Sequence, residues 1–131
     1  MKNKGYTLVE LLTVLIIIGI ISALVIPNIS RTLKQQRVKL YNKQVNEIIN
    51  MTKNWSAKNL DKLPSDENIT YVSLATLING KYLEQDDIID PRDEEPMLGC
   101  VSISYDPNYK QHNFTFIGED DTNYSECDNS I

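Results

Sequence analysis

Few side chains in this sequence have the types and the spacing that catalysis or metal binding requires. His112 is the only histidine, so a zinc site of the usual kind would lack ligands, and we interpret it as an exposed residue opening a strand. The serines form no nucleophile elbow or triad, and the glycines form no phosphate-binding loop. We therefore expect a protein that is not an enzyme and that needs no cofactor.

The acid-rich stretch at residues 84–97 is the best candidate for binding a cation. Calcium prefers several oxygen ligands on a flexible loop. EF-hand spacing is absent, however, and a solvated turn would have the same composition. We therefore expect no metal site and keep calcium as the weaker alternative, with candidate ligands Asp86, Asp87, Asp90 and Asp93.

Two cysteines, Cys100 and Cys127, lie in the last third of the chain. In an exported domain an even pair predicts a disulfide, whereas in the cytosol the same pair predicts free thiols. Closing a loop of this length stabilises a protein by about 3–4 kcal/mol. The choice therefore depends on whether this part of the chain leaves the cytoplasm.

Glu10 is a single acid near the front of an apolar run. Twenty residues without charge separate it from Arg31, and a membrane-spanning helix needs about 20 such residues. In lipid the backbone must satisfy its own polar groups, so the run is predicted to be helical despite its many isoleucines and valines. Gly19 and Pro27 are the weak points, and we expect a kink or local melting just before Pro27.

After Pro27 the pattern becomes that of an amphipathic helix, with apolar residues recurring about every 3.6 positions. One long helix is therefore predicted from about Tyr6 to about Asn59, with Pro64 as its latest possible end. It is apolar on all sides in its first half and striped in its second half. The stripe consists of Ile29, Leu33, Leu40, Tyr41, Val45, Ile48, Ile49, Thr52 and Trp55.

The remaining residues predict a short helix and a small antiparallel sheet. The stretch "SLATLINGKYL" is typical of a helix with Ser73 as N-cap and Gly80 as C-cap. The stretches "CVSISY" and "HNFTFI" alternate as strands do, and the turn "DPNYKQ" joins them. We expect this hairpin to lie on the apolar stripe of the long helix, with an irregular tail after Gly118. The predicted fold class is α+β.

Charge is divided sharply along the chain, whose formal net charge is −5. Residues 31–46 hold five bases and no acid, whereas residues 47–131 hold 17 acids and 6 bases, a net charge of −11. The acidic region should repel nucleic acid. The basic stretch suits docking onto the acidic region of other copies of the chain. A solvated helix face, or binding of anionic lipid or extracellular DNA, remains the alternative.

The stretch "KGYTLVELL" resembles the class III signal of type IV prepilins and pseudopilins. A short basic leader ends in Gly5, Tyr6 would be the first mature residue, and Glu10 is the fifth residue after that cut. Pro27 also matches a proline often found there. The resemblance implies a leader at residues 1–5, a membrane and filament-core helix at residues 6–30, and a C-terminal domain at residues 31–131. It also implies cleavage between Gly5 and Tyr6 and N-methylation of Tyr6 by the same peptidase.

Cleavage would give Glu10 a physical role in assembly. It creates an amine at Tyr6, and staggered helices in a filament could place the amine of one subunit beside Glu10 of another. A buried ion pair is favourable only when both partners are present. A subunit inserted at the wrong height would therefore leave a charge unpaired, which makes Glu10 a device for setting register.

The resemblance implies a structural subunit of a type IV pilus-like filament. The implied partners are itself and other pilins, the prepilin peptidase, a membrane assembly platform with its ATPase, and membrane lipid before assembly. The main alternative is a pseudopilin of a type II secretion or competence (DNA-uptake) system. A membrane-tethered binding domain that never polymerises is a third interpretation, and it would tolerate loss of Glu10.

The charges beside the apolar run and the N-terminal signal predict opposite topologies. Two bases precede the apolar run and five follow it closely, so the positive-inside rule alone would keep the C-terminal domain in the cytoplasm. The signal implies the opposite, because the peptidase of this family works at the cytoplasmic face. We follow the signal, which predicts a single-pass membrane protein with an extracytoplasmic domain that later enters an extracellular pilus or pseudopilus. A Cys100–Cys127 disulfide is then favoured.

Overall fold

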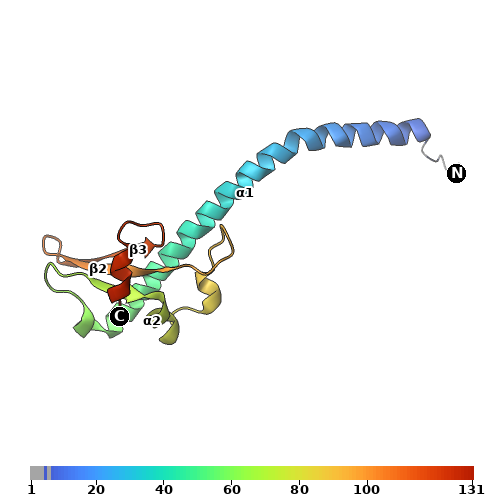
Figure 1. Cartoon of the computed structure of the whole chain (residues 1–131). Helices are drawn as coiled ribbons and strands as arrows, with labels where there is room; N and C mark the ends of the chain where they lie inside the picture. The colour runs from blue at the N-terminus through green and yellow to red at the C-terminus, as the bar shows by residue number, and fades with distance from the viewer. Residues whose placement is uncertain (1–4, 6) are drawn as a thin grey trace. The chain divides into compact units, whose positions relative to one another are not determined.

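The computed structural model describes Gly5 and residues 7–131. The chain divides into two compact units, Met1–Arg37 and Val38–Ile131, and the second of these is called the head below. Helix α1, Leu8–Lys58, begins in the first unit and ends in the second (Figure 1). The head adds a short helix and an antiparallel sheet to its part of α1. The α+β class predicted from the sequence is confirmed.

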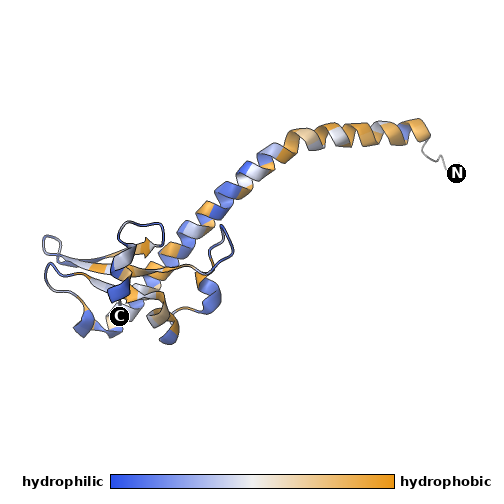
Figure 2. Cartoon of the chain, in the orientation of Figure 1, coloured by the Kyte–Doolittle hydropathy of each residue, from blue (hydrophilic) through white to orange (hydrophobic). Residues whose placement is uncertain are grey.

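Helix α1 begins two residues after its predicted start at Tyr6 and ends one residue before its predicted end at Asn59. Hydrophobic residues fill its first part, and hydrophilic residues alternate with them in its second part (Figure 2). The helix continues without a break through Gly19 and Pro27, so the local melting expected before Pro27 does not occur. Proline removes one backbone hydrogen bond, and the surrounding turns keep theirs. The kink itself stays a prediction.

The sheet of the head has three antiparallel strands in the order β1-β2-β3. Strands β2, Gly99–Asp106, and β3, Gln111–Gly118, form the predicted hairpin, in which Ile103 pairs with Phe114. Strand β1, Thr70–Ser73, was not predicted and adds to the other edge of β2. Helix α2, Leu74–Asn79, follows β1 directly and has the predicted caps, with the Ser73 side chain accepting from the Thr76 N–H.

The core of the head lies between the second part of α1 and the sheet. Ile48 and Trp55 of α1 are buried together with Val72, Val101 and Ile103 of the strands. Alternation places Val101 and Ile103 on the same face of β2, so the hairpin lies on the helical stripe as predicted. Two polar residues of α1 are buried as well, and their hydroxyls donate to carbonyl oxygens one turn earlier; these are Thr52 of the stripe and its neighbour Ser56.

The C-terminal tail is tied to the sheet at two points. The Cys100–Cys127 disulfide joins β2 to a 3-10 helix, η3, at Tyr124–Asn129. Beyond it, the N–H of Ile131 donates to the carbonyl of Tyr71, and the backbone oxygen of Ile131 accepts from the N–H of Ser73. The predicted disulfide is therefore present, and the tail continues the pairing at the outer edge of β1.

Candidate functional site

The N-terminal end of α1 carries a reciprocal pair of hydrogen bonds between Thr7 and Glu10. The backbone N–H of Thr7 donates to Oε2 of Glu10 over 3.1 Å, and the backbone N–H of Glu10 donates to Oγ1 of Thr7 over 3.3 Å. Since α1 begins at Leu8, Thr7 is the N-cap and Glu10 is the third helical residue. This geometry is a capping box, which satisfies two N–H groups that a helix start would otherwise leave free.

From the sequence, Glu10 was predicted to act in assembly, and its bond to Thr7 was not predicted. The signal was present in the stretch "TLVE", a threonine followed three residues later by a glutamate, directly before an apolar run. The box gives the carboxylate a partner inside its own chain. The positive end of the helix dipole favours an acid at the same place. Among described residues only Oε2 of Glu10 is engaged, which leaves Oε1 available for another donor.

The predicted cleavage site borders this box. Gly5 is exposed, and a Cβ added to it would meet nothing within 4 Å. Tyr6, the predicted site of cleavage and methylation, lies outside the described residues, as do Lys2 and Lys4 of the predicted leader.

The apolar residues that follow Glu10 lie on all sides of α1 and are exposed. Leu24 is 70% exposed and Ile26 is 61% exposed. This helix is long and apolar enough to cross a membrane, judged by length and composition. Exposed apolar patches of this kind mark sites that contact a membrane or other proteins.

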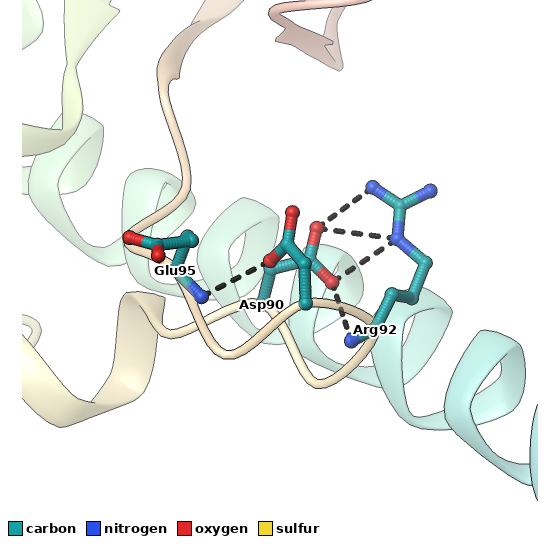
Figure 3. Close-up of polar contacts among 4 residues, drawn as sticks. Asp90, Arg92 and Glu95 are labelled. Atoms are coloured by element: carbon teal, nitrogen blue, oxygen red, sulfur yellow. Dashed lines mark hydrogen bonds and ion pairs between the residues drawn. The ribbon is translucent and has the colours of Figure 1, made fainter.

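A second polar cluster lies in the head, where Asp90, Arg92 and Tyr41 meet. The Arg92 guanidinium donates to both oxygens of Asp90, with 2.7 Å between Nη2 and Oδ2 and 3.0 Å between Nε and Oδ1 (Figure 3). Its carbon Cζ lies 3.6 Å from the centre of the Tyr41 ring. The ion pair with Asp90 lies within the acid-rich loop, and the cation–π contact with Tyr41 fastens this loop to α1.

The hydrogen bonds from Arg92 hold the pKa of the Asp90 carboxyl below its ordinary value, against the opposing effect of burial. Asp90 is 6% exposed. The backbone of the loop is closed around it, since the Asp90 N–H donates to the carbonyl of Glu95 and the Asp90 carbonyl accepts from Glu94. Asp90 is therefore a structural acid.

The weaker calcium hypothesis gains no support from the arrangement of its candidate ligands. The Asp87 carboxylate accepts from the N–H of Glu84, and the Asp93 carboxylate accepts from the N–H of Glu95. Asp90 is taken by Arg92, and Asp86 is exposed. Within residues 5 and 7–131, no three His, Cys, Asp or Glu side chains gather as a metal site would require.

The prediction of an exposed His112 was wrong. His112 lies in β3 and is half-buried, with its Nε2 atom 2.8 Å from the carbonyl oxygen of Pro64. Its ring also packs against Tyr105, at 5.3 Å between ring centres. The segment after α1 folds back over this end of the hairpin. Strand alternation is a local pattern, so it cannot predict that residues far away in the sequence bury His112.

Comparison with known families identifies the N-terminal segment. Residues 1–26 match the model of the prokaryotic N-terminal methylation motif, which is the class III signal of type IV pilins. The match covers Gly5, Tyr6 and Glu10 and ends one residue before Pro27. Searches of curated proteins and of solved structures gave no significant match.

Proposed function

We propose that this pilin-type precursor is cut between Gly5 and Tyr6 and becomes a structural subunit of a type IV pilus-like filament. The observation that carries the proposal is the methylation motif at residues 1–26, which runs directly into the long helix α1. The exposed apolar residues of α1 also support it. Lipid would cover this surface before assembly, and the helices of neighbouring subunits would cover it in a filament.

Glu10 is the residue proposed to guide assembly. Before assembly, the Thr7–Glu10 capping box gives the Glu10 carboxylate one hydrogen-bond donor, the Thr7 N–H. Cleavage after Gly5 then creates a cation at Tyr6, and the Tyr6 amine of a neighbouring subunit becomes the partner of Glu10. A lone carboxylate at the centre of a bilayer costs about 2.5–3.5 kcal/mol on insertion scales. A partner amine would remove that cost only at the correct height.

The disulfide supports a head that lies outside the cytoplasm. Disulfides persist in oxidising compartments and are rare in the cytosol, and Cys100 and Cys127 are bonded in the head. The proposed order is membrane insertion with residues 1–5 on the cytoplasmic side, cleavage and methylation there, and extraction by an assembly platform with its ATPase. Residues 6–30 would then form the core of the filament and residues 31–131 its outer part.

Processing is tested by replacing Gly5 with valine in the full chain expressed in its own host. A branched side chain at the cut hinders a protease that grips extended backbone, so we expect the leader to be retained. Gly19→Val is the matched control, because a Cβ at Gly19 also meets nothing within 4 Å. It should be cleaved normally. Mass spectrometry of the N-terminal peptide distinguishes a retained leader from an N-methylated Tyr6, and normal processing of Gly5→Val would refute the proposed cut.

Assembly is tested by shearing fibres from cells and labelling them with an antibody to the head. A filament subunit should be recovered in fibres that carry the label along their length. Replacing Glu10 with alanine separates this function from a plain membrane tether. A tether would reach the membrane and work with alanine at this position, whereas a filament subunit should reach the membrane and yield few fibres.

A further inference from the structure

The part of α1 around residues 29–43 carries an apolar stripe that nothing in the described chain covers. Ile29, Leu33 and Leu40 are separated by four and seven residues, so they share one side of the helix. Their side chains are 49%, 54% and 51% exposed. Leu33 and Leu40 lie beyond the predicted filament core at residues 6–30, so a membrane does not account for the whole stripe.

Basic residues border this stripe. Arg37 follows Leu33 by four residues and Lys43 follows Leu40 by three, which places both bases beside it. Arg31 falls about 180° away around the helix at 3.6 residues per turn. The described chain, Gly5 and residues 7–131, contains a single ion pair, between Arg92 and Asp90. The bases of this segment are therefore without acidic partners in the described chain.

The head contains a groove of about 800 Å³ with an acidic rim, opposite in charge to the bases beside the stripe. Its apolar part includes Val45 of α1 and Phe116 of β3, together with Leu98, which is 51% exposed. Its acidic rim is Asp93, Glu95, Glu119, Asp120 and Asp121, all exposed. Arg92 and Asp90 also line the groove, where they form an ion pair with each other. The rim therefore presents five carboxylates that form no ion pair within the described part of the chain.

We propose that this groove receives residues 29–43 of a second copy of the chain. The apolar stripe would lie on the apolar part of the groove, and the bases beside the stripe would meet the acidic rim. Arg37 and Lys43 lie beside the stripe and five acids line the rim, so the two surfaces carry opposite charge. This inference rests on the proposed filament, which would bring many copies of the chain side by side.

A small ligand fits the groove less well. Small-molecule pockets of this size, roughly 300–1,000 Å³, are lined mainly by hydrophobic and aromatic groups with few polar ones. Here acids form a large part of the lining. Complementary charge across a protein contact guides encounter and excludes wrong partners. A helix with both bases and exposed leucines can contact the acidic rim and the apolar part of the groove at once.

The test is a charge exchange in the full chain, read as the amount of sheared fibre per cell. The helix variant is Arg37→Glu with Lys43→Glu. The groove variant is Glu119→Lys with Asp120→Lys, whose carboxylates accept no hydrogen bond among the described residues. We expect each double variant to lose about tenfold or more in fibre yield, because attraction becomes repulsion. The four substitutions together should return the yield to within about threefold of the parent chain.

Matched controls carry the same change in charge at other places. Arg31→Glu with Lys81→Glu reverses two bases away from the stripe, and Asp61→Lys with Glu67→Lys reverses two exposed acids outside the groove. Both controls should keep a normal yield. Normal yield from the helix and groove variants, or failure of the fourfold variant to recover, would overturn the proposed contact. Disulfide formation on a non-reducing gel shows that each head is folded.

Photo-crosslinking gives a second, independent measurement. A photoreactive amino acid at Leu98, in the groove, should capture a second copy of the chain, and mass spectrometry should place the attachment within residues 29–43. Attachment to another part of the chain, or to a different protein, would contradict the inference. If the parent chain gives no fibres, the proposed filament function itself is wrong. If it gives fibres without this crosslink, only the groove contact is wrong.

Discussion

Replacing Glu10 by glutamine and by alanine separates the two roles that this side chain can have. As a cap, Glu10 needs only an oxygen that accepts the Thr7 N–H, and glutamine supplies one. As the partner of a neighbouring amine, it needs a negative charge, which glutamine lacks. The two substitutions should therefore behave alike if charge matters in assembly, and differently if Glu10 serves only to cap α1.

The geometry sets the size of the expected effects. Loss of a capping side chain costs about 1 kcal/mol, which is about fivefold in an equilibrium constant. Removing one partner of a buried ion pair costs about 3–5 kcal/mol, or roughly 100- to 4,000-fold. We therefore expect both Glu10→Gln and Glu10→Ala to lower subunit association by about 100-fold or more. Thr7→Val, which removes only the oxygen accepting the Glu10 N–H, should lower it by about fivefold.

The assay compares fibre yield with the amount of subunit in the membrane. All three variants should be present in membranes at parental levels, as judged with an antibody to the head. Circular dichroism of the full chain in detergent reports whether the helix is retained. Parental fibre yield from Glu10→Gln together with a small loss from Glu10→Ala would refute the ion-pair argument and leave Glu10 as a helix cap.

Three further predictions concern the stability of the head, measured on the full chain in mild detergent by urea unfolding and tryptophan fluorescence. Replacing Cys100 and Cys127 with alanine should lower the free energy of unfolding by about 3.6 kcal/mol, from the entropy of the loop that their 27-residue separation closes; a loss below about 1 kcal/mol would contradict this. Because the folded-state pKa of Asp90 is lowered, its contribution is present above the unfolded-state value and is lost as pH falls through the folded one. Asp90→Asn should therefore reduce the loss of stability on acidification below about pH 4, and an unchanged pH profile would count against it. Gly99→Ala should destabilise the head by about 1–3 kcal/mol or more, because its φ of +148° suits glycine and the new Cβ would overlap the carbonyl oxygen of Ile117; parental stability would show that the backbone adjusts.

The parts of the fold that could be predicted from the sequence are those encoded by local periodicity and caps. Apolar residues at every second position, Val101 and Ile103 in β2 and Phe114 and Phe116 in β3, predicted both strands and the faces that they present to α1. The side chain of Ser73 marked the start of α2 because a serine oxygen can accept the N–H of the first turn. Each of these signals acts within a few residues, so no tertiary information was needed.

The parts that could not be predicted depend on contacts between distant residues. Strand β1 has four residues, too few for alternation to be distinctive, and it is held between β2 and the tail at Ile131. The contact between Arg92 and Tyr41 joins residues 51 positions apart. The groove likewise combines residues of α1, the acid-rich loop and the segment after β3. Nothing in the order of these residues along the chain indicates that they meet.

In the proposed assembly, polar groups should decide when and where the subunit leaves the membrane. Lipid tails are as apolar as leucine, so moving a helix from a bilayer into a bundle of helices changes hydrophobic burial little. The exposed residues of α1 from Leu8 to Ile26 therefore favour both locations almost equally. The capping box gives Glu10 a partial partner in either location, whereas the amine and the acidic groove of another subunit are available only where a second copy is present. It follows that mutations among the apolar residues should change how firmly the subunit is held in both places, while mutations at Glu10, Arg37 and Lys43 should change the balance between them.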